Sequence, residues 1–83
     1  MKFKNKTIEE LEVMSFDDLA YEILKEKGKK MKTSDIFKII CEILNLSESE
    51  FEAQIADFFT LLATEKRFIQ LEKGFWDLRE NHT

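Results

Sequence analysis

The sequence has no proline, only two glycines and one cysteine among its 83 residues. No proline-rich linker divides the chain, and no internal repeat or low-complexity segment is visible. Because Cys41 is the only cysteine, an internal disulfide is excluded, and the core must depend on packing alone, as expected in a reducing compartment. The sequence therefore predicts one cytoplasmic domain.

Long apolar runs are also missing. No run approaches the ~18 residues that a membrane-spanning helix needs, and the start has lysines but no apolar region typical of a signal peptide. Hydrophobic residues make up 43% and charged residues 36% of the chain, which is typical of a soluble globular domain. The net charge of −4 opposes a general attraction to phosphates, so any DNA contact would need a local basic patch.

Helix-start signals divide the first half of the chain. Thr7 and Glu10 fit a capping box that begins a short helical turn, Ile8 to about Met14. Ser15 is then the expected N-cap of a first main helix, which ends at Gly28 because glycine accepts the left-handed conformation.

Two further main helices are predicted by the same reasoning. Thr33 or Ser34 is the expected N-cap of the second, and Ser47 with Glu50 forms a capping box for the third, which should end near residues 64–66. The apolar face of the third helix and the following hairpin supply most of the expected core: Phe51, Ile55, Phe58, Phe59, Trp76 and Leu78.

The stretch after the third helix alternates apolar and polar residues, as in a β-hairpin. Ile69 and Leu71 are expected to share one apolar face with Trp76 and Leu78, with Gly74 in the left-handed region of the connecting loop. A two-stranded hairpin is marginal alone, so this face should lie on the helices, and residues near Met31 are candidates for a short third strand.

These elements predict a mainly α domain with a small antiparallel β-sheet, a winged helix-turn-helix with three main helices and a C-terminal hairpin wing. The domain is expected to span residues 7–79, between flexible termini at residues 1–6 and 80–83. Nothing in the pattern demands a dimer, so a monomer is expected.

Charge is distributed unevenly. The third helix carries carboxylates and no basic residue before Lys66, so they would repel a DNA backbone; they form either a solvated face or an acidic docking surface for a protein. The acidic positions are Glu48, Glu50, Glu52 and Asp57. A lysine cluster precedes the second main helix and is either a solvated loop or a contact for nucleic acid or an acidic tail: Lys25, Lys27, Lys29, Lys30 and Lys32.

The hairpin adds four candidate contact residues. In a regular ribbon Phe68 and Phe75 point away from Ile69 and Trp76, so at least one is available to a partner, unless the two rings pair across the ribbon. Arg67 and Arg79 flank the hairpin and either pair with acidic residues such as Asp77 or point outward. The alternative function, a DNA-binding regulator, would use basic residues from both regions: Lys29, Lys30, Lys32, Lys66, Lys73, Arg67 and Arg79.

Catalysis and cofactor binding have no support. His82 is expected to be mobile near the chain end, without a fixed carboxylate or thiol beside it, and Cys41 is expected to be a partly buried hydrophobe. One cysteine and one remote histidine make neither a zinc site nor a catalytic dyad, and no glycine-rich phosphate loop is present. No enzyme activity, metal or cofactor is therefore predicted.

The order "SFDDLAYEIL", "QIADFFTLL", "RFIQL" and "FWDLR" resembles the N-terminal HARE-HTH domain of the delta subunit of RNA polymerase from Gram-positive bacteria. Lys66 and Asp77 stand where that pattern usually has glycine. The residues that carry the resemblance are Gln54, Phe58, Phe59, Arg67, Phe68, Trp76, Leu78 and Arg79.

The resemblance implies a noncatalytic accessory domain that docks on core RNA polymerase. In that family an acidic tail follows the domain and competes with nucleic acid. This competition affects transcription initiation, promoter selectivity and recycling of the polymerase. The implied contact surface is the third helix with the hairpin, and weak or no nucleic-acid binding is expected of the domain itself. The candidate polymerase contacts are Glu48, Glu50, Glu52, Asp57, Arg67, Phe68, Phe75 and Arg79.

Overall fold

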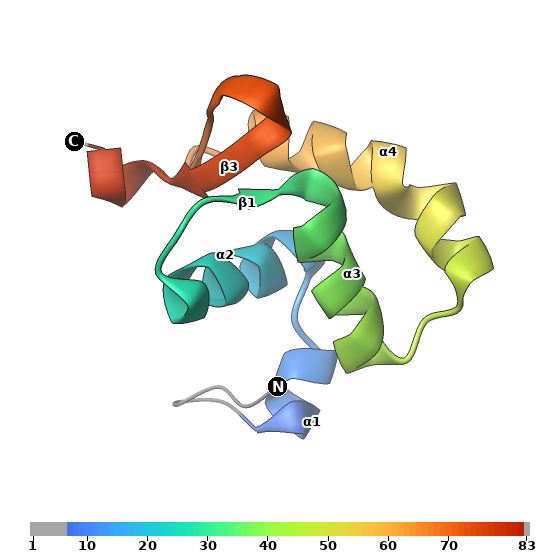
Figure 1. Ribbon diagram of the computed structural model, residues 1–83. Coiled ribbons are helices and arrows are strands. Elements are labelled where there is room, and N and C mark those ends of the chain that lie inside the picture. Colours follow the sequence, from blue (N-terminus) through green and yellow to red (C-terminus); the bar gives the residue numbers. More distant parts are fainter. Residues whose placement is uncertain (1–6, 83) are drawn as a thin grey trace.

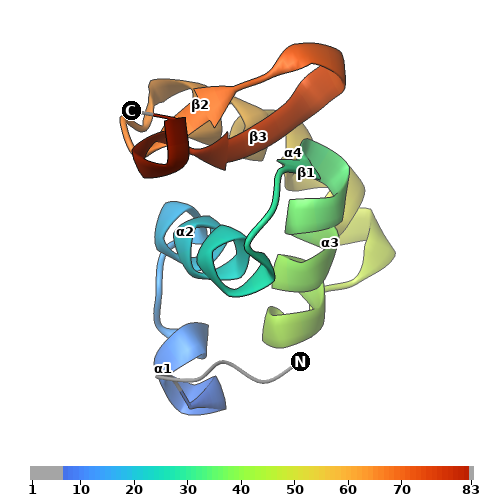
Figure 2. The same ribbon diagram turned by 60° about the vertical axis from the view of Figure 1, so that its left-hand side comes forward.

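The computed structural model describes residues 7–82, so the expected flexible segment at residues 1–6 lies outside the described residues. The helices pack together, with the sheet at one end of the helical layer and the short first helix at the other (Figures 1 and 2). The predicted winged helix-turn-helix is confirmed. In chain order the elements are α1 (Ile8–Glu12), α2 (Phe16–Lys27), β1 (Met31–Lys32), α3 (Thr33–Leu44), α4 (Glu48–Thr64), β2 (Phe68–Gln70), the 3-10 turn η1 (Glu72–Gly74), β3 (Phe75–Leu78) and η2 (Arg79–His82).

The expected helix caps are mostly present. Thr7 and Glu10 form the capping box of α1, and the side chain of Ser47 accepts the Glu50 N–H at 3.2 Å at the start of α4. Gly28 ends α2 with a φ of 67°. Thr33 or Ser34 was the expected N-cap of α3, and this was wrong by one or two residues, because the helix begins at Thr33 and no side chain caps it. The Thr33 hydroxyl is used elsewhere, as the acceptor of a hydrogen bond from Trp76.

The predicted third strand is confirmed. The sheet has the order β1-β3-β2 with both pairs antiparallel, and Met31 lies opposite Trp76. The Leu71 N–H donates to the Phe75 carbonyl at 2.8 Å and closes the wing loop. Gly74 has the expected positive φ of 78°, and Lys73 has one as well, at 62°.

The phase of β2 differs from the prediction. Phe68 lies directly opposite Leu78 and is only 2% exposed, whereas Ile69 lies opposite Asp77. Because side chains alternate along a strand, a pairing shifted by one residue moves every side chain to the other face. Phe68, predicted as a possible partner contact, is therefore a core residue, and Ile69 is on the face away from Leu78.

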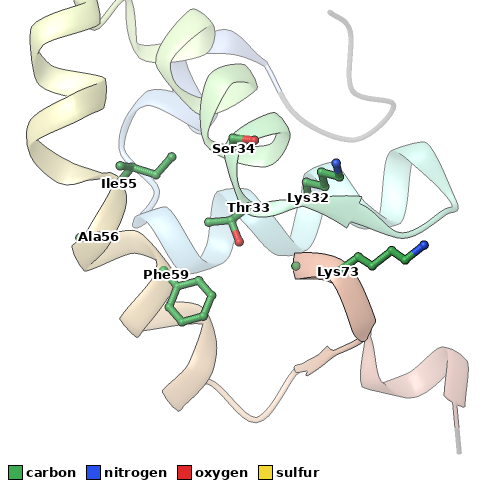
Figure 3. A pocket seen from close by; sticks show the side chains of 8 residues that line it. Lys32, Thr33, Ser34, Ile55, Ala56, Phe59 and Lys73 are labelled. Carbon is green, nitrogen blue, oxygen red and sulfur yellow. The ribbon is translucent and has the colours of Figure 1, made fainter.

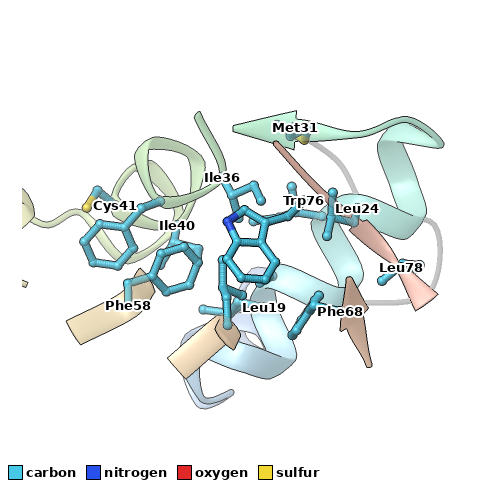
Figure 4. Close-up of a cluster of buried hydrophobic side chains, with 14 of the residues drawn as sticks. Leu19, Leu24, Met31, Ile36, Ile40, Cys41, Phe58, Phe68, Trp76 and Leu78 are labelled. Carbon is cyan, nitrogen blue, oxygen red and sulfur yellow. The ribbon is translucent and has the colours of Figure 1, made fainter. Parts of the chain in front are cut away.

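The core lies between the helices and the inner face of the sheet. Figure 4 shows the indole of Trp76, which is 1% exposed, within this cluster beside Ile36 and Leu19. Rings also pack on one another, with Phe37 stacked on Phe58 at 4.7 Å between centroids. The cluster comprises Leu11, Leu19, Ala20, Ile23, Leu24, Met31, Ile36, Phe37, Ile40, Cys41, Phe58, Leu62, Phe68, Trp76 and Leu78.

Three of the predicted core positions on α4 are less buried than expected. Phe51 and Ile55 are partly buried and pack against the core, and Phe59 is 39% exposed. The buried stripe of α4 runs through Phe58 and Leu62, and Phe59 stands about a quarter turn further round the helix. Its ring instead meets the edge of Trp76, with 5.6 Å between the two centroids. Cys41 is buried, more fully than the partly buried hydrophobe that the sequence indicated.

Candidate functional site

The exposed acidic residues of α4, which we call the acidic face, cover two flanks of the helix: Glu48 and Glu52 lie on one flank, and Glu50 and Asp57 lie about half a turn away. Glu48, Glu50, Glu52 and Asp57 are all exposed, and none of them forms an ion pair within residues 7–82. Glu48 and Glu50 lie in the first turn, where carboxylates interact favourably with the helix dipole, whereas Asp57 lies beyond its range. Only Glu50 has a side-chain partner among the described residues, the Ser47 hydroxyl at 3.3 Å. The other three carboxylates are available to a partner molecule.

Arg67 is not part of such an open surface. Its guanidinium lies 2.8 Å from Asp18, 3.2 Å from Glu65 and 3.5 Å from Asp17, and it packs over the Tyr21 ring at 5.1 Å. A hydrogen bond from Ser15, with smaller contributions from neighbouring groups, lowers the pKa of Asp17 against the opposing effect of burial. Arg67 therefore joins α2 to the start of β2 rather than facing outward.

Arg79 also serves the fold. Its Nε–H donates to the Lys66 carbonyl at 2.8 Å, and its terminal nitrogen donates to the Phe68 carbonyl at 3.3 Å. Arg79 thus connects the end of β3 to the start of β2. With Arg67 tied to α2 and Phe68 in the core, three of the predicted polymerase contacts have structural roles in this domain.

The structure assembles one polar cluster that the sequence analysis missed. Asp77 is 8% exposed and accepts hydrogen bonds from the Leu78 N–H at 2.8 Å and from Asn81 at 3.3 Å, and it lies 2.9 Å from His82 Nε2. Burial would raise the pKa of Asp77, but the hydrogen bonds from His82, Leu78 and Asn81 together lower it below its ordinary value.

This cluster involves the last described residues of the chain, and the expected flexibility of residues 80–83 stays a prediction. Residues 79–82 form the 3-10 turn η2 over Asp77, and His82 has a carboxylate beside it, contrary to the prediction. A second contact connects η2 to α2, because the Tyr21 hydroxyl donates a hydrogen bond to the Glu80 carboxylate at 2.8 Å. A sequence signal exists in hindsight, because Asp77 precedes Asn81 and His82 at a spacing that one turn brings together. Thr83 lies outside the described residues.

The lysines of the cluster are exposed, but they do not all lie together. Lys25 lies over the Tyr21 ring at 5.6 Å, whereas Lys30 and Lys32 lie over the Phe75 ring at 5.0 and 5.5 Å. Phe75, predicted as a possible partner contact, is half-buried beneath these ammonium groups. A shallow cavity of about 520 Å³ adjoins it, lined by Lys27, Lys29, Lys30, Met31, Asp35, Ile39 and Phe75.

Membrane-spanning helices and metal sites are both missing from residues 7–82. No helix among them is long and apolar enough to cross a membrane. Within the same part of the chain, no group of three or more histidine, cysteine, aspartate or glutamate side chains is arranged to hold a metal ion.

Comparison with known proteins gives consistent matches. The chain is 36% identical to a probable DNA-directed RNA polymerase subunit delta of Macrococcus caseolyticus over 80 residues, which are 96% of this chain and 46% of the relative. Proteins of the same name from Bacillus anthracis and Lactobacillus acidophilus are each 33% identical, over 95% and 94% of this chain and 45% and 41% of their own lengths. The chain thus spans less than half the length of these relatives.

The profile of the HARE-HTH family, a helix-turn-helix domain described from ASXL proteins and restriction endonucleases among others, matches residues 14–80. These residues run from just before α2 through β3 and into η2, so the match covers the three main helices and the whole sheet. The chain therefore belongs to the HARE-HTH family.

Proposed function

We propose that this domain is a noncatalytic accessory part of bacterial RNA polymerase, and that it docks on the core enzyme. The observation that carries the proposal is the similarity to delta subunits over nearly the whole domain, at up to 36% identity among the relatives described above. By that likeness the complete protein would influence the initiation of transcription, the selectivity for promoters and the recycling of the polymerase.

The acidic face of α4 is the docking surface that the geometry favours. Glu48, Glu52 and Asp57 are exposed and unpaired within the described chain, so a basic patch on the polymerase could engage them without breaking an internal contact. Attraction of this kind steers association and weakens as salt screens it. Of the four predicted contacts on the hairpin, only Phe75 has a side chain that does not hold parts of the domain together.

DNA binding is the second candidate, and the lysines around Phe75 are the observation that favours it. The set of basic residues available for it is smaller than predicted, however, because Arg67 and Arg79 hold carboxylates and carbonyls of the domain itself. In a DNA-binding winged helix, the helix that enters the major groove supplies base and phosphate contacts. Here that helix, α4, carries four carboxylates and no basic residue.

A single experiment separates the two. The purified chain is immobilised and incubated with core RNA polymerase from a Bacillus species, while a labelled DNA duplex is titrated in parallel at about 50 and 200 mM salt, where phosphate contacts lose most of their affinity. Retention of the polymerase without a duplex shift supports docking. A salt-sensitive duplex shift without retained polymerase would refute docking and favour the DNA-binding alternative.

A further inference from the structure

A groove lies between α4, the start of α3 and the wing loop, and none of the roles described above uses it. Its volume is about 380 Å³, at the lower end of the ~300–1,000 Å³ typical of ligand sites. Ile55, Ala56 and Phe59 of α4 form one wall (Figure 3). The other wall is formed by Lys32 with the start of α3, including Ser34, and by Lys73 of the wing loop.

The wall from α4 is apolar and accessible. Phe59 is 39% exposed, and its ring is held in place by its edge contact with Trp76, so it offers a rigid apolar surface. From Phe58 to Thr64 the helix carries no charged residue, and Phe59, Thr60 and Ala63 are exposed there. Rigid aromatic side chains at the centre of a small pocket are typical anchors in protein recognition.

The opposite wall is basic. Lys32 and Lys73 are exposed and form no ion pair within residues 7–82. They extend away from Phe59 towards solvent in Figure 3. A lysine ammonium on its flexible four-carbon stem can turn to meet a carboxylate. Lys30 continues the same positive strip over Phe75.

From this arrangement we infer that the groove binds an acidic peptide segment of a partner protein, with one bulky apolar side chain as its anchor. The anchor lies against Ile55 and Phe59, and the flanking carboxylates run over Lys32 and Lys73. The basic wall sets this orientation, because Lys32 and Lys73 are the charged residues among those that line the groove. The inference stands apart from polymerase docking, which concerns the acidic residues of α4, because none of these lines the groove.

Single-stranded nucleic acid fits the same surface less well. Binding of this kind needs aromatic faces on which bases can stack, together with a continuous basic track. Phe59 is the one ring that lines the groove, the Phe75 ring is covered by Lys30 and Lys32, and both arginines of the hairpin are engaged elsewhere.

The test uses the 83-residue chain and a short fluorescein-labelled peptide in which two adjacent leucines are flanked by glutamates. Binding is followed by fluorescence anisotropy and by amide chemical shifts. We expect the amides of Ser34, Phe59 and Gly74 to shift and those of Glu48 and Glu50 to remain in place. A second peptide, with serines in place of the leucines, should bind about tenfold more weakly.

Two variants and a matched control sharpen the result. Phe59→Ser, and the double variant Lys32→Glu with Lys73→Glu, should each weaken peptide binding about tenfold. The control is the double variant Lys25→Glu with Lys66→Glu, which has the same net charge but changes exposed lysines outside the groove. Melting temperatures confirm that each variant is folded.

Several outcomes overturn the inference. They are the absence of peptide binding by the unchanged chain, an equal loss of binding in the control variant, or equal binding of the serine peptide. A labelled single-stranded oligonucleotide that displaces the peptide and loses affinity steeply with salt would assign the groove to nucleic acid instead.

Discussion

The indole Nε1–H of Trp76 donates a hydrogen bond of 2.8 Å to the hydroxyl of Thr33, and this bond joins the middle strand of the sheet to the first residue of α3. Replacing Thr33 by valine would leave the buried indole N–H without an acceptor. We expect Thr33→Val to lower the free energy of unfolding by about 1–3 kcal/mol, while Thr33→Ser, which keeps the hydroxyl, changes it much less. Urea unfolding followed by tryptophan fluorescence measures both, and equal stabilities would show that the bond contributes nothing.

Arg67 supports a second prediction, since its planar guanidinium contacts three carboxylates at once. Arg67→Lys keeps the charge but loses the forked geometry, so we expect a loss of about 1 kcal/mol in unfolding free energy, and a larger loss for Arg67→Met. The side chain is partly exposed, so the difference between the variants should shrink in about 1 M salt. A difference that does not respond to salt would indicate that packing on Tyr21 dominates.

Asp77 makes stability depend on pH in a defined direction. Its pKa is lower in the folded protein than its ordinary value of 3.8, so its contribution is fully present above that value and is lost as the pH falls through the folded pKa. Asp77→Asn removes this contribution. The stability difference between the unchanged protein and Asp77→Asn should therefore be largest near neutral pH and should decrease below about pH 4.

Thermal unfolding at a series of pH values tests this prediction for Asp77. Asp57→Asn provides the control, because it removes an exposed carboxylate of α4 that has no ion pair within the described chain. A stability difference for Asp77→Asn that stays constant between neutral and acidic pH would contradict the prediction.

The acidic face of α4 is tested by charge reversal. We expect the triple variant Glu48→Lys, Glu50→Lys and Glu52→Lys to remain folded, with a stability loss of about 1–3 kcal/mol because lysines oppose the helix dipole. Polymerase retention should fall at least about tenfold relative to the unchanged chain. The glutamine triple variant separates loss of attraction from new repulsion. Unchanged retention by the lysine variant would show that the acidic face is not the docking surface.

The helices were predictable because their signals are local. A capping box such as Ser47 with Glu50 needs only a few neighbouring residues, and so does a glycine that ends a helix, such as Gly28. The third strand near Met31 was also predicted, from the argument that two strands alone are marginal.

Features that depend on distant residues were not predictable in the same way. The phase of β2 follows from the pairing of Phe68 with Leu78, which apolar alternation alone does not determine because Phe68 and Ile69 are both apolar. The partial exposure of Phe59 depends on where α4 meets the sheet. The role of Arg67 depends on its contact with α2, which is distant in the sequence. Asp77 instead meets nearby residues of η2, at a spacing that the sequence analysis did not recognise.

The candidate docking site stays a prediction. The carboxylates of α4 are exposed, as an acidic surface requires, whereas Arg67, Phe68 and Arg79 stabilise the fold. The sequence patterns indicated the lysine cluster as a candidate contact site. They did not indicate the groove beside it, because α3, α4 and the wing loop form the groove together.

The sheet order β1-β3-β2 has a consequence for biosynthesis. The central strand, Phe75–Leu78, is the last of the three to be translated, so β1 and β2 have no strand partner until it has been synthesised. Pairings between residues distant in sequence slow folding, and unpaired strand edges expose a chain to aggregation. The wing therefore has to leave the ribosome before the sheet can form. The helices leave it first, with part of their core still uncovered.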